Sequence, residues 1–267
     1  MARLRFAKGH ALGNDYIVVR ASDVGRDLSD DDVLRLCHRH QGVGADGVIE
    51  VLAIVDGEAL TRVWNPDGSV AEVSGNGLRI AAACLAHGSH PVIVDALRSA
   101  GRVFPVRGVG ESSIAIDLPP ARIEAIRETL VIADHEVHTT LVDIGNPHAV
   151  IEASEVDDAL FTVIAPLLES HPRWPNRRNV ERVAILGAQH IAVDLFERGV
   201  GPTSASGTGA TAATVAAVAA GLVGAGDVRV TMEGGEVTVR VAAETLTLTG
   251  PVVVLFEGEL ANWPGVT

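Results

Sequence analysis

The sequence is poor in several residue types that mark whole classes of protein. Its two cysteines, Cys37 and Cys84, are not part of a CxxC pair, which disfavours a zinc site and a secreted disulfide scaffold. Lysine occurs once, at Lys8, so a pyridoxal enzyme would have only one candidate for its Schiff base. The formal net charge is -13, and no Lys/Arg-rich patch is visible, which argues against nucleic-acid binding.

Long runs of large hydrophobic residues are also missing. The N-terminal segment MARLRFAKGHALGNDY contains no apolar stretch typical of a secretory signal. The uncharged run from Gly207 to Gly226 has about the length of a membrane span. It consists of Ala, Gly, Thr and Val with one Leu, which favours a buried helix. We therefore expect a cytoplasmic protein with an acidic surface and no membrane contact.

What the chain does contain is an internal repeat. The segments 72-EVSGNGLRIAAACLAHG-88 and 204-SASGTGATAATVAAVAAGL-222 both place a serine before Gly-x-Gly and a helix of small residues. Ser74 and Ser206 are 206 − 74 = 132 residues apart, close to half of the 267 residues. The repeat indicates two structurally similar halves. The same offset relates Gly13-Asn14 to Gly145-Asn146, Gly47 to Asn179, and Asn65 to Glu197.

The pattern predicts an α+β fold of two pseudo-symmetric domains, each a strand-rich half wrapped around a central apolar helix. Pro119-Pro120 is a natural joint because proline pairs break both helices and ladders. The tail 251-PVVVLFEGEL-260 reads as a strand that can return to the first domain. We expect an N-terminal domain of residues 1–118 plus about 252–267, and a C-terminal domain of residues 119–251.

Individual elements follow from the same reading. The central helices should begin just after Ser74 and Ser206, and shorter helices are predicted at 30–38 and 159–169. Short β-branched runs predict strands at 16–19, 48–55, 91–97, 190–196, 228–232 and 236–242.

A serine followed by Gly-x-Gly at a helix start is a candidate anion site, because the first backbone N–H groups are unpaired and carry partial positive charge. Two such sites facing one small anion suit a racemase or epimerase, in which one group removes a proton from a carbon and another returns one on the opposite face. The simpler interpretation is that both serines are N-caps. The segment 207-GTGATA-212, with Asp227 further on, also resembles a dinucleotide fingerprint, but the βαβ alternation around it is poor.

The chain resembles the diaminopimelate epimerase family, whose members are two-domain, cofactor-independent enzymes of lysine and cell-wall biosynthesis. The resemblance runs nearly end to end. It implies a diamino diacid substrate with an amino-acid group at each end, and no metal. The motifs that carry it are 8-KGHALGNDYIVV-19, 42-GVGADGVI-49, 65-NPDGSVAEVSGNGLR-79, 143-DIGNPHAV-150, 175-PNRRNVERV-183 and 196-FERGVGPTSASGTGA-210.

The resemblance also implies roles for individual residues. Ser74 and Ser206 stand at the acid/base positions, with His148 and Glu197 managing protons beside them. The backbone amides at the two helix starts would hold the carboxylate of the reacting carbon. The implied substrate-binding residues are Asn14, Asn65, Gly75, Asn76, Asn146, Asn179, Glu197, Arg198, Gly207 and Thr208.

The departures from the family pattern bear on activity. The family has cysteine at both acid/base positions, where a thiol near a helix N-terminus can ionise at neutral pH. A serine hydroxyl does not ionise usefully without a strong base, so we expect an impaired enzyme. A second departure is Gly47, where relatives can carry a larger polar residue that adds a substrate contact.

Other functions remain open at this point. A related racemase or isomerase of another amino or hydroxy acid would use the same scaffold, and a non-catalytic protein would keep only the binding pocket. A serine hydrolase is disfavoured because the sequence has no G-x-S-x-G elbow. A homodimer is compatible with a protein of this type, although no feature of the sequence requires one.

Overall fold

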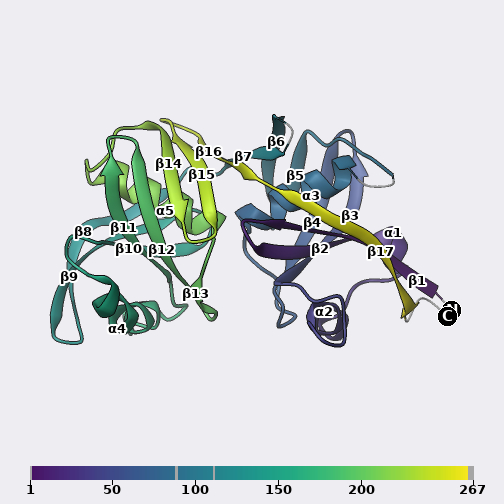
Figure 1. The fold of residues 1–267 in the computed structure, drawn as a ribbon, viewed down its shortest axis with the longest axis horizontal. Coiled ribbons are helices and arrows are strands. Elements are labelled where there is room, and N and C mark those ends of the chain that lie inside the picture. The colour runs from purple at the N-terminus through teal and green to yellow at the C-terminus, as the bar shows by residue number, and fades with distance from the viewer. Residues whose placement is uncertain (1, 88–89, 111, 264–267) are drawn as a thin grey trace. The chain divides into compact units, whose positions relative to one another are not determined.

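The computed structural model describes residues 2–87, 90–110 and 112–263, and it has the predicted α+β class (Figure 1). The chain divides into two units. Unit 1 contains Met1–Ile116 together with Gly250–Thr267, and unit 2 contains Asp117–Thr249. Each limit lies two residues before the domain limit expected from the sequence, at 116/117 instead of 118/119 and at 249/250 instead of 251/252.

Unit 1 is built on one mixed β-sheet (Figure 1). In spatial order its strands are β17 (Val253–Trp263), β1 (Ala2–Ala11), β2 (Asn14–Arg20), β3 (Gly47–Val55), β4 (Glu58–Trp64), β5 (Ala96–Ser99) and β6 (Arg102–Val109). The pairs β2–β3 and β4–β5 are parallel, and the other neighbours are antiparallel. Because β17 pairs with β1, the C-terminal strand returns to unit 1.

Unit 2 repeats this plan. Its strands follow in the order β8 (Arg122–Ile132), β9 (His135–Asp143), β10 (Pro147–Glu152), β11 (Asn179–Gly187), β12 (His190–Glu197), β14 (Gly226–Met232), β15 (Gly235–Val241) and β16 (Leu246–Pro251). The pairs β10–β11 and β12–β14 are parallel. The short β13 (Gly201–Thr203) pairs with β12, and β7 (Ser113–Leu118) pairs with β6.

The strand registers of the two units correspond at the predicted offset. Tyr16 lies opposite Gly47 between β2 and β3, and His148 lies opposite Asn179 between β10 and β11. The residue numbers of both members of the pair differ by the same offset between the two units, since 148 − 16 = 132 and 179 − 47 = 132. Equivalent residues therefore occupy equivalent places in the two sheets, which supports the reading of the sequence as a repeat.

A buried helix packs on each sheet. Helix α3 (Gly75–His87) lies against β1, β2, β3 and β17, and α5 (Gly207–Ala219) lies against the strands of unit 2. Residues 75–85 of α3 and 207–217 of α5 are all buried. A helix surrounded by protein on every side has no polar face, which explains the long runs of small residues. Both helices begin directly after the predicted serines, at 74 and 206.

Two of the remaining helices are capped at their starts by side chains. In α2 (Asp30–Cys37), Ser29 and Asp32 form a reciprocal capping box. In α4 (Asp158–Glu169), the Asp157 side chain accepts from the Leu160 amide. These two helices match the predictions at 30–38 and 159–169 to within one residue. A single turn, α1 (Ala21–Val24), follows β2.

One predicted strand is wrong over most of its length. The run 91–97 forms a strand only from Ala96, where β5 begins. Ile93 is 82% exposed, and the Val92 amide donates to the Leu85 carbonyl at the end of α3, so this β-branched segment closes a helix instead of entering the sheet. Among the described residues, no helix has the length and apolar character needed to cross a membrane.

Candidate functional site

Ser74 stands at the start of α3 with its hydroxyl engaged. Its Oγ accepts from the Gly77 amide at 3.0 Å and lies 3.1 Å from the hydroxyl oxygen of Tyr16 on β2. The contact with the third helical amide is the geometry of an N-cap. Gly75 and Asn76 form the first turn, where backbone amides have no intrahelical acceptor. Unit 1 therefore presents a half-buried hydroxyl beside a helix N-terminus.

A chain of side-chain hydrogen bonds orients the two amide residues of this site. The Asn76 Nδ2 donates to Asn14 Oδ1 at 3.2 Å, and the Asn14 Nδ2 donates to Asp46 Oδ2 at 3.1 Å. Asp46 is in turn bound by Arg39 at 2.6 Å. Asp46 accepts at one end of this series of hydrogen bonds, and Arg79 donates to Asn76 at the other end. The orientations of the Asn14 and Asn76 amide groups are therefore both determined.

The donor at the other end is Arg79, which lies one turn into α3. Its Nη2 donates to Asn76 Oδ1 at 2.7 Å, and its Nε donates to the Gly75 carbonyl at 3.3 Å. The side chain is 0% exposed, and burial lowers the pKa of Arg79 to about 10. It therefore remains a cation at neutral pH.

A partly exposed ion network supports the strand that carries Asn14. Lys8 on β1 contacts Asp15 at 2.9 Å and also donates to the Gly44 carbonyl, and Arg39 contacts Asp15 at 3.0 Å. Burial opposes ionisation of Asp15, but Arg39 and Lys8 together hold its pKa below the ordinary value. Lys8, the single lysine, therefore has a structural ion-pair role here.

Ser206 repeats the Ser74 geometry in unit 2 with a different neighbour. It is the N-cap of α5, and its Oγ accepts from the Gly209 amide at 3.2 Å. The same hydroxyl donates to Glu197 Oε2 at 3.4 Å. Gly207 and Thr208 form the first turn of the helix. Unit 2 thus places a carboxylate beside its serine, where unit 1 has a tyrosine hydroxyl.

His148 is fully buried beneath this helix start. Its Nδ1 lies 2.7 Å from Glu181 Oε1, and its Nε2 lies 3.0 Å from Asn146 Oδ1. Asn146 Nδ2 then donates to Thr208 Oγ1 at 3.4 Å. Because an amide oxygen only accepts, Nε2 carries a proton. Burial raises the pKa of Glu181, and Glu197 raises it further, while His148 opposes the shift.

The asparagine pairs of the two units correspond. Asn14 and Asn76 are linked across 76 − 14 = 62 residues, and Asn146 and Thr208 are linked across 208 − 146 = 62 residues. Each link joins the start of a strand to the first turn of the central helix: Asn14 is the first residue of β2, and Asn146 directly precedes β10. Of the predicted binding residues, Asn14 is therefore joined to Asn76 in unit 1 and Asn146 to Thr208 in unit 2.

Two further predicted residues, Asn179 and Arg198, are joined in unit 2. Asn179 Oδ1 accepts from the Arg198 amide at 3.0 Å, and its Nδ2 donates to the Pro147 carbonyl at 3.2 Å. The Arg198 side chain donates to the Asn176 carbonyl at 3.2 Å. These bonds hold the turn after β12. Glu197 is the last residue of that strand and directly precedes the turn.

Asn65 lies in the turn that follows β4. Its Nδ2 donates to Ser69 Oγ at 2.9 Å, and its amide donates to the Ser69 carbonyl at 2.8 Å. The side chain is half-buried. The turn role is thus visible, and a substrate contact for Asn65 stays a prediction.

The second departure, Gly47, has a local steric cause. A Cβ at this position would lie 2.5 Å from the Trp64 carbonyl oxygen and 2.5 Å from Tyr16 Cε1. Both atoms belong to neighbouring strands of the sheet, so this chain has no room for a side chain there.

The sequence reading did not identify Tyr16, Arg79, Asp46 or Glu181. One signal was available for Tyr16, because the offset relates it to His148, a residue that was singled out. Arg79 was visible as the lone charge in the apolar segment 75-GNGLRIAAACLA-86. Asp46 and Glu181 gave no comparable signal, since their partners are distant in sequence.

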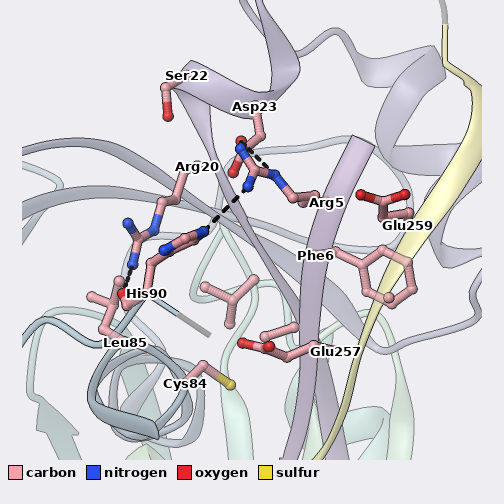
Figure 2. Close-up of a pocket in the computed structure, with 13 residues that line it drawn as sticks. Arg5, Phe6, Arg20, Ser22, Asp23, Cys84, Leu85, His90, Glu257 and Glu259 are labelled. Carbon is pink, nitrogen blue, oxygen red and sulfur yellow. Dashed lines mark hydrogen bonds and ion pairs between the residues drawn. The ribbon is translucent and has the colours of Figure 1, made fainter. Parts of the chain in front are cut away.

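A cavity of about 380 Å³ lies elsewhere in unit 1 (Figure 2). Its polar groups are largely engaged with one another: Arg5 pairs with Asp23 at 2.8 Å, and Arg20 donates to the His90 carbonyl at 2.8 Å. Cys84 on α3 lines its base, and burial together with Glu257 raises the pKa of this thiol to about 12. The cavity contains none of the predicted site residues.

Comparison with known sequences identifies relatives over nearly the whole chain. A family model described as diaminopimelate epimerase matches residues 6–104 and 140–255. A diaminopimelate epimerase from Synechocystis sp. is 37% identical over 279 residues, covering 96% of this chain and 98% of the relative. One from Azoarcus sp. is 37% identical, covering 96% and 98%, and one from Nitrosomonas europaea is 35% identical, covering 97% and 99%.

Solved structures share the fold at low sequence identity. A phenazine biosynthesis protein of the PhzF family from Bacillus anthracis aligns with a TM-score of 0.74 at 14% identity, covering 97% of this chain and 99% of the other. A predicted epimerase from Pseudomonas aeruginosa gives 0.73 at 18%, covering 97% and 99%. A hydroxyproline epimerase from Agrobacterium vitis with bound trans-4-hydroxy-L-proline gives 0.71 at 15%, covering 97% and 91%.

Proposed function

Because this chain belongs to the diaminopimelate epimerase family, we propose that its scaffold interconverts LL- and meso-diaminopimelate by taking a proton from the α-carbon on one face and returning one on the other. The observation that carries this proposal is the repeated helix start. In both units a serine caps a buried helix and an asparagine side chain is bound to the first turn.

The two helix starts suit the carboxylate of the reacting carbon. The backbone amides of Gly75 and Asn76 in one unit, and of Gly207 and Thr208 in the other, belong to first turns that lack intrahelical acceptors. As the α-proton leaves, negative charge moves onto this carboxylate. Donors fixed in advance stabilise that charge without reorganising.

The remaining polar residues suit the charged groups of a diamino diacid. Arg198 has the planar fork that binds a carboxylate, and Glu197 has the charge that binds an ammonium group. Amide side chains bind both groups, which we assign to Asn14, Asn65, Asn146 and Asn179.

The serines set the rate of this chain. Ser74 and Ser206 occupy the acid/base positions. Among the described residues, the Ser74 hydroxyl lies beside the Tyr16 hydroxyl and the Ser206 hydroxyl beside the Glu197 carboxylate, and neither neighbour is a strong base of the kind that activates a serine nucleophile. Within the described part of unit 2, the ring nitrogens of the buried His148 contact Glu181 and Asn146 and not the Ser206 hydroxyl. We propose that His148 acts by orienting Asn146. We also propose that the native chain, with serine at both positions, catalyses epimerisation slowly.

Product formation tests this account. LL-diaminopimelate would be incubated with the native chain, with S74C/S206C and with S74A/S206A, and the meso isomer would be quantified by chiral chromatography. We expect S74C/S206C to be roughly a hundredfold or more faster than the native chain, and S74A/S206A to be inactive. An S74C/S206C variant that is folded but inactive would contradict the proposal.

A second function is favoured by the same two serines. A protein that keeps the binding residues and loses both thiols suits a role as a non-catalytic diamino-diacid binder. Calorimetry with meso-diaminopimelate, using L-lysine as the matched control with one carboxylate removed, measures this directly. Tight binding of diaminopimelate together with no turnover would support the non-catalytic binder, while turnover by the native chain would reject this second function.

A cytoplasmic location and a homodimer stay predictions.

A further inference from the structure

We propose that Arg79 is a fixed buried cation that favours an anionic group at position 74, whereas the acidic surroundings of position 206 disfavour one. The two acid/base positions would then be electrostatically unequal although their backbones repeat. The catalytic meaning of this asymmetry rests on the proposed epimerase function. The asymmetry itself does not, and it can be measured without substrate.

The contacts of Arg79 direct its charge at the first turn of α3. Nη2 and Nε bind Asn76 Oδ1 and the Gly75 carbonyl, both in that turn. The side chain is 0% exposed, and Nη1 has no hydrogen-bond partner among the described residues. A buried and incompletely paired guanidinium has an uncompensated positive field, which water does not screen.

No carboxylate neutralises this charge within the described part of unit 1. Burial is the single cause of its pKa shift, and no nearby acid opposes it. The titratable side chains on the strands packed against α3 have other partners: Lys8 with Asp15, His10 with the Gly13 amide, Tyr16 with Ser74, Glu50 with Arg62 and Trp64, Arg5 with Asp23, Arg3 with Glu259, Arg20 with the His90 carbonyl, and Glu257 near Cys84.

Unit 2 has no counterpart of this cation. The residue at the repeat offset from Arg79 is Thr211, since 79 + 132 = 211, and its hydroxyl donates to the Gly207 carbonyl at 2.8 Å. A neutral hydroxyl therefore occupies the place that the guanidinium takes in unit 1. The dipole of α5 itself still contributes positive charge at this first turn.

Position 206 also faces acids. Glu197 Oε2 lies 3.4 Å from Ser206 Oγ, and the buried Glu181 lies under the same turn, where a Cβ on Gly209 would be 3.1 Å from its Oε1. His148 pairs with Glu181. Other charged side chains on the strands packed against α5 have their own partners: Glu124 with Arg178, Glu128 with Arg173, Asp143 with Arg122, His138 with Glu155, Arg182 with Asp194, Asp227 with Arg240, and His190 with Arg229.

A thiol at each position reports the field around it, because a nearby cation lowers a thiol pKa and nearby acids raise it. We would measure the pH dependence of iodoacetamide alkylation in S74C and in S206C by mass spectrometry. The native thiols give little background: burial raises the pKa of Cys37 to about 11 and of Cys84 to about 12.

We expect the thiol pKa in S74C to be lower than in S206C by about one unit or more. Adding R79Q should raise the thiol pKa of S74C and leave that of S206C unchanged. Adding R79K should restore most of the lowering, because lysine keeps the charge. Circular dichroism and thermal melting would establish that each variant is folded.

Equal thiol pKa values in S74C and S206C would overturn the proposal. So would an equal response of both thiols to R79Q. If R79Q does not fold, the comparison of the two single variants still decides the matter. An inactive S74C/S206C variant with unequal thiol pKa values would reject the epimerase function and leave this inference standing. An active S74C/S206C variant with equal thiol pKa values would support the epimerase function and reject this inference.

Discussion

The hydroxyl oxygen of Tyr16 lies 3.1 Å from Ser74 Oγ, and Tyr16 occupies the place in unit 1 that His148 occupies in unit 2. Tyr16 contacts the serine of its own unit directly. His148 contacts Asn146 and Glu181 instead. The repeat has therefore kept the backbone register and changed the side-chain chemistry around each helix start.

The Tyr16–Ser74 bond predicts a measurable coupling. Removing the hydroxyl with Y16F should lower the free energy of unfolding by about 1 kcal/mol, the usual net value of a hydrogen bond. A double-mutant cycle with S74A isolates the pair, and we expect the two losses to be non-additive. Urea unfolding of the four proteins measures this. Additive losses would show that the contact contributes nothing specific.

Glu181 predicts a pH-dependent stability. Burial raises its pKa above the ordinary value, so the protonated form favours the folded state. That stabilisation is present below the pKa of the unfolded chain and is lost as pH rises through the folded-state pKa. Glutamine does not titrate. The stability of E181Q relative to the native chain should therefore increase as pH rises from about 4.5.

Thermal unfolding of the native chain and of E181Q between pH 4.5 and 8 measures this difference in stability. The exposed Glu136, changed to glutamine, serves as the control, and its stability difference should stay flat. A difference for E181Q that shrinks with rising pH would mean that Glu181 is held as a carboxylate by His148.

Gly47 predicts a steric cost. Its missing Cβ would meet a backbone oxygen and the Tyr16 ring at 2.5 Å, and neither can move without disturbing the sheet. We expect G47A to lower the free energy of unfolding by about 1–3 kcal/mol. The matched control is G108A on β6, where a Cβ would meet nothing within 4 Å. Equal stability of the two variants in urea would contradict this account.

The sequence predicted the parts of the fold that depend on local pattern. The starts of α3 and α5 follow from Gly-x-Gly before a run rich in small apolar residues, and the repeat follows from landmarks at one offset. The strand expected at 91–97 failed because a short β-branched run fits both a strand and an exposed helix-closing segment. Ile93, at 82% exposure, shows which applies.

The missed site residues have a different cause. Arg79 and Glu181 are charged residues that are buried in the fold, and the sequence alone does not show that a charged side chain is buried. Asp46 lies in the motif 42-GVGADGVI-49, in which only Gly47 was discussed, yet it accepts from the side chain of Asn14. The contacts Asn14–Asp46 and His148–Glu181 join residues 32 and 33 positions apart, and local sequence patterns do not encode contacts over such separations.

The central claim is that positions 74 and 206 each handle the proton on one face of the α-carbon. Deuterium incorporation at that carbon in heavy water tests it most directly, using S74C and S206C separately with the LL and meso isomers. We predict complementary behaviour: one variant exchanges the LL isomer, the other exchanges the D-configured centre of the meso isomer, and the native serine chain exchanges neither at a comparable rate. Exchange of the same isomer by both variants, or rapid exchange by the native chain, would contradict the account.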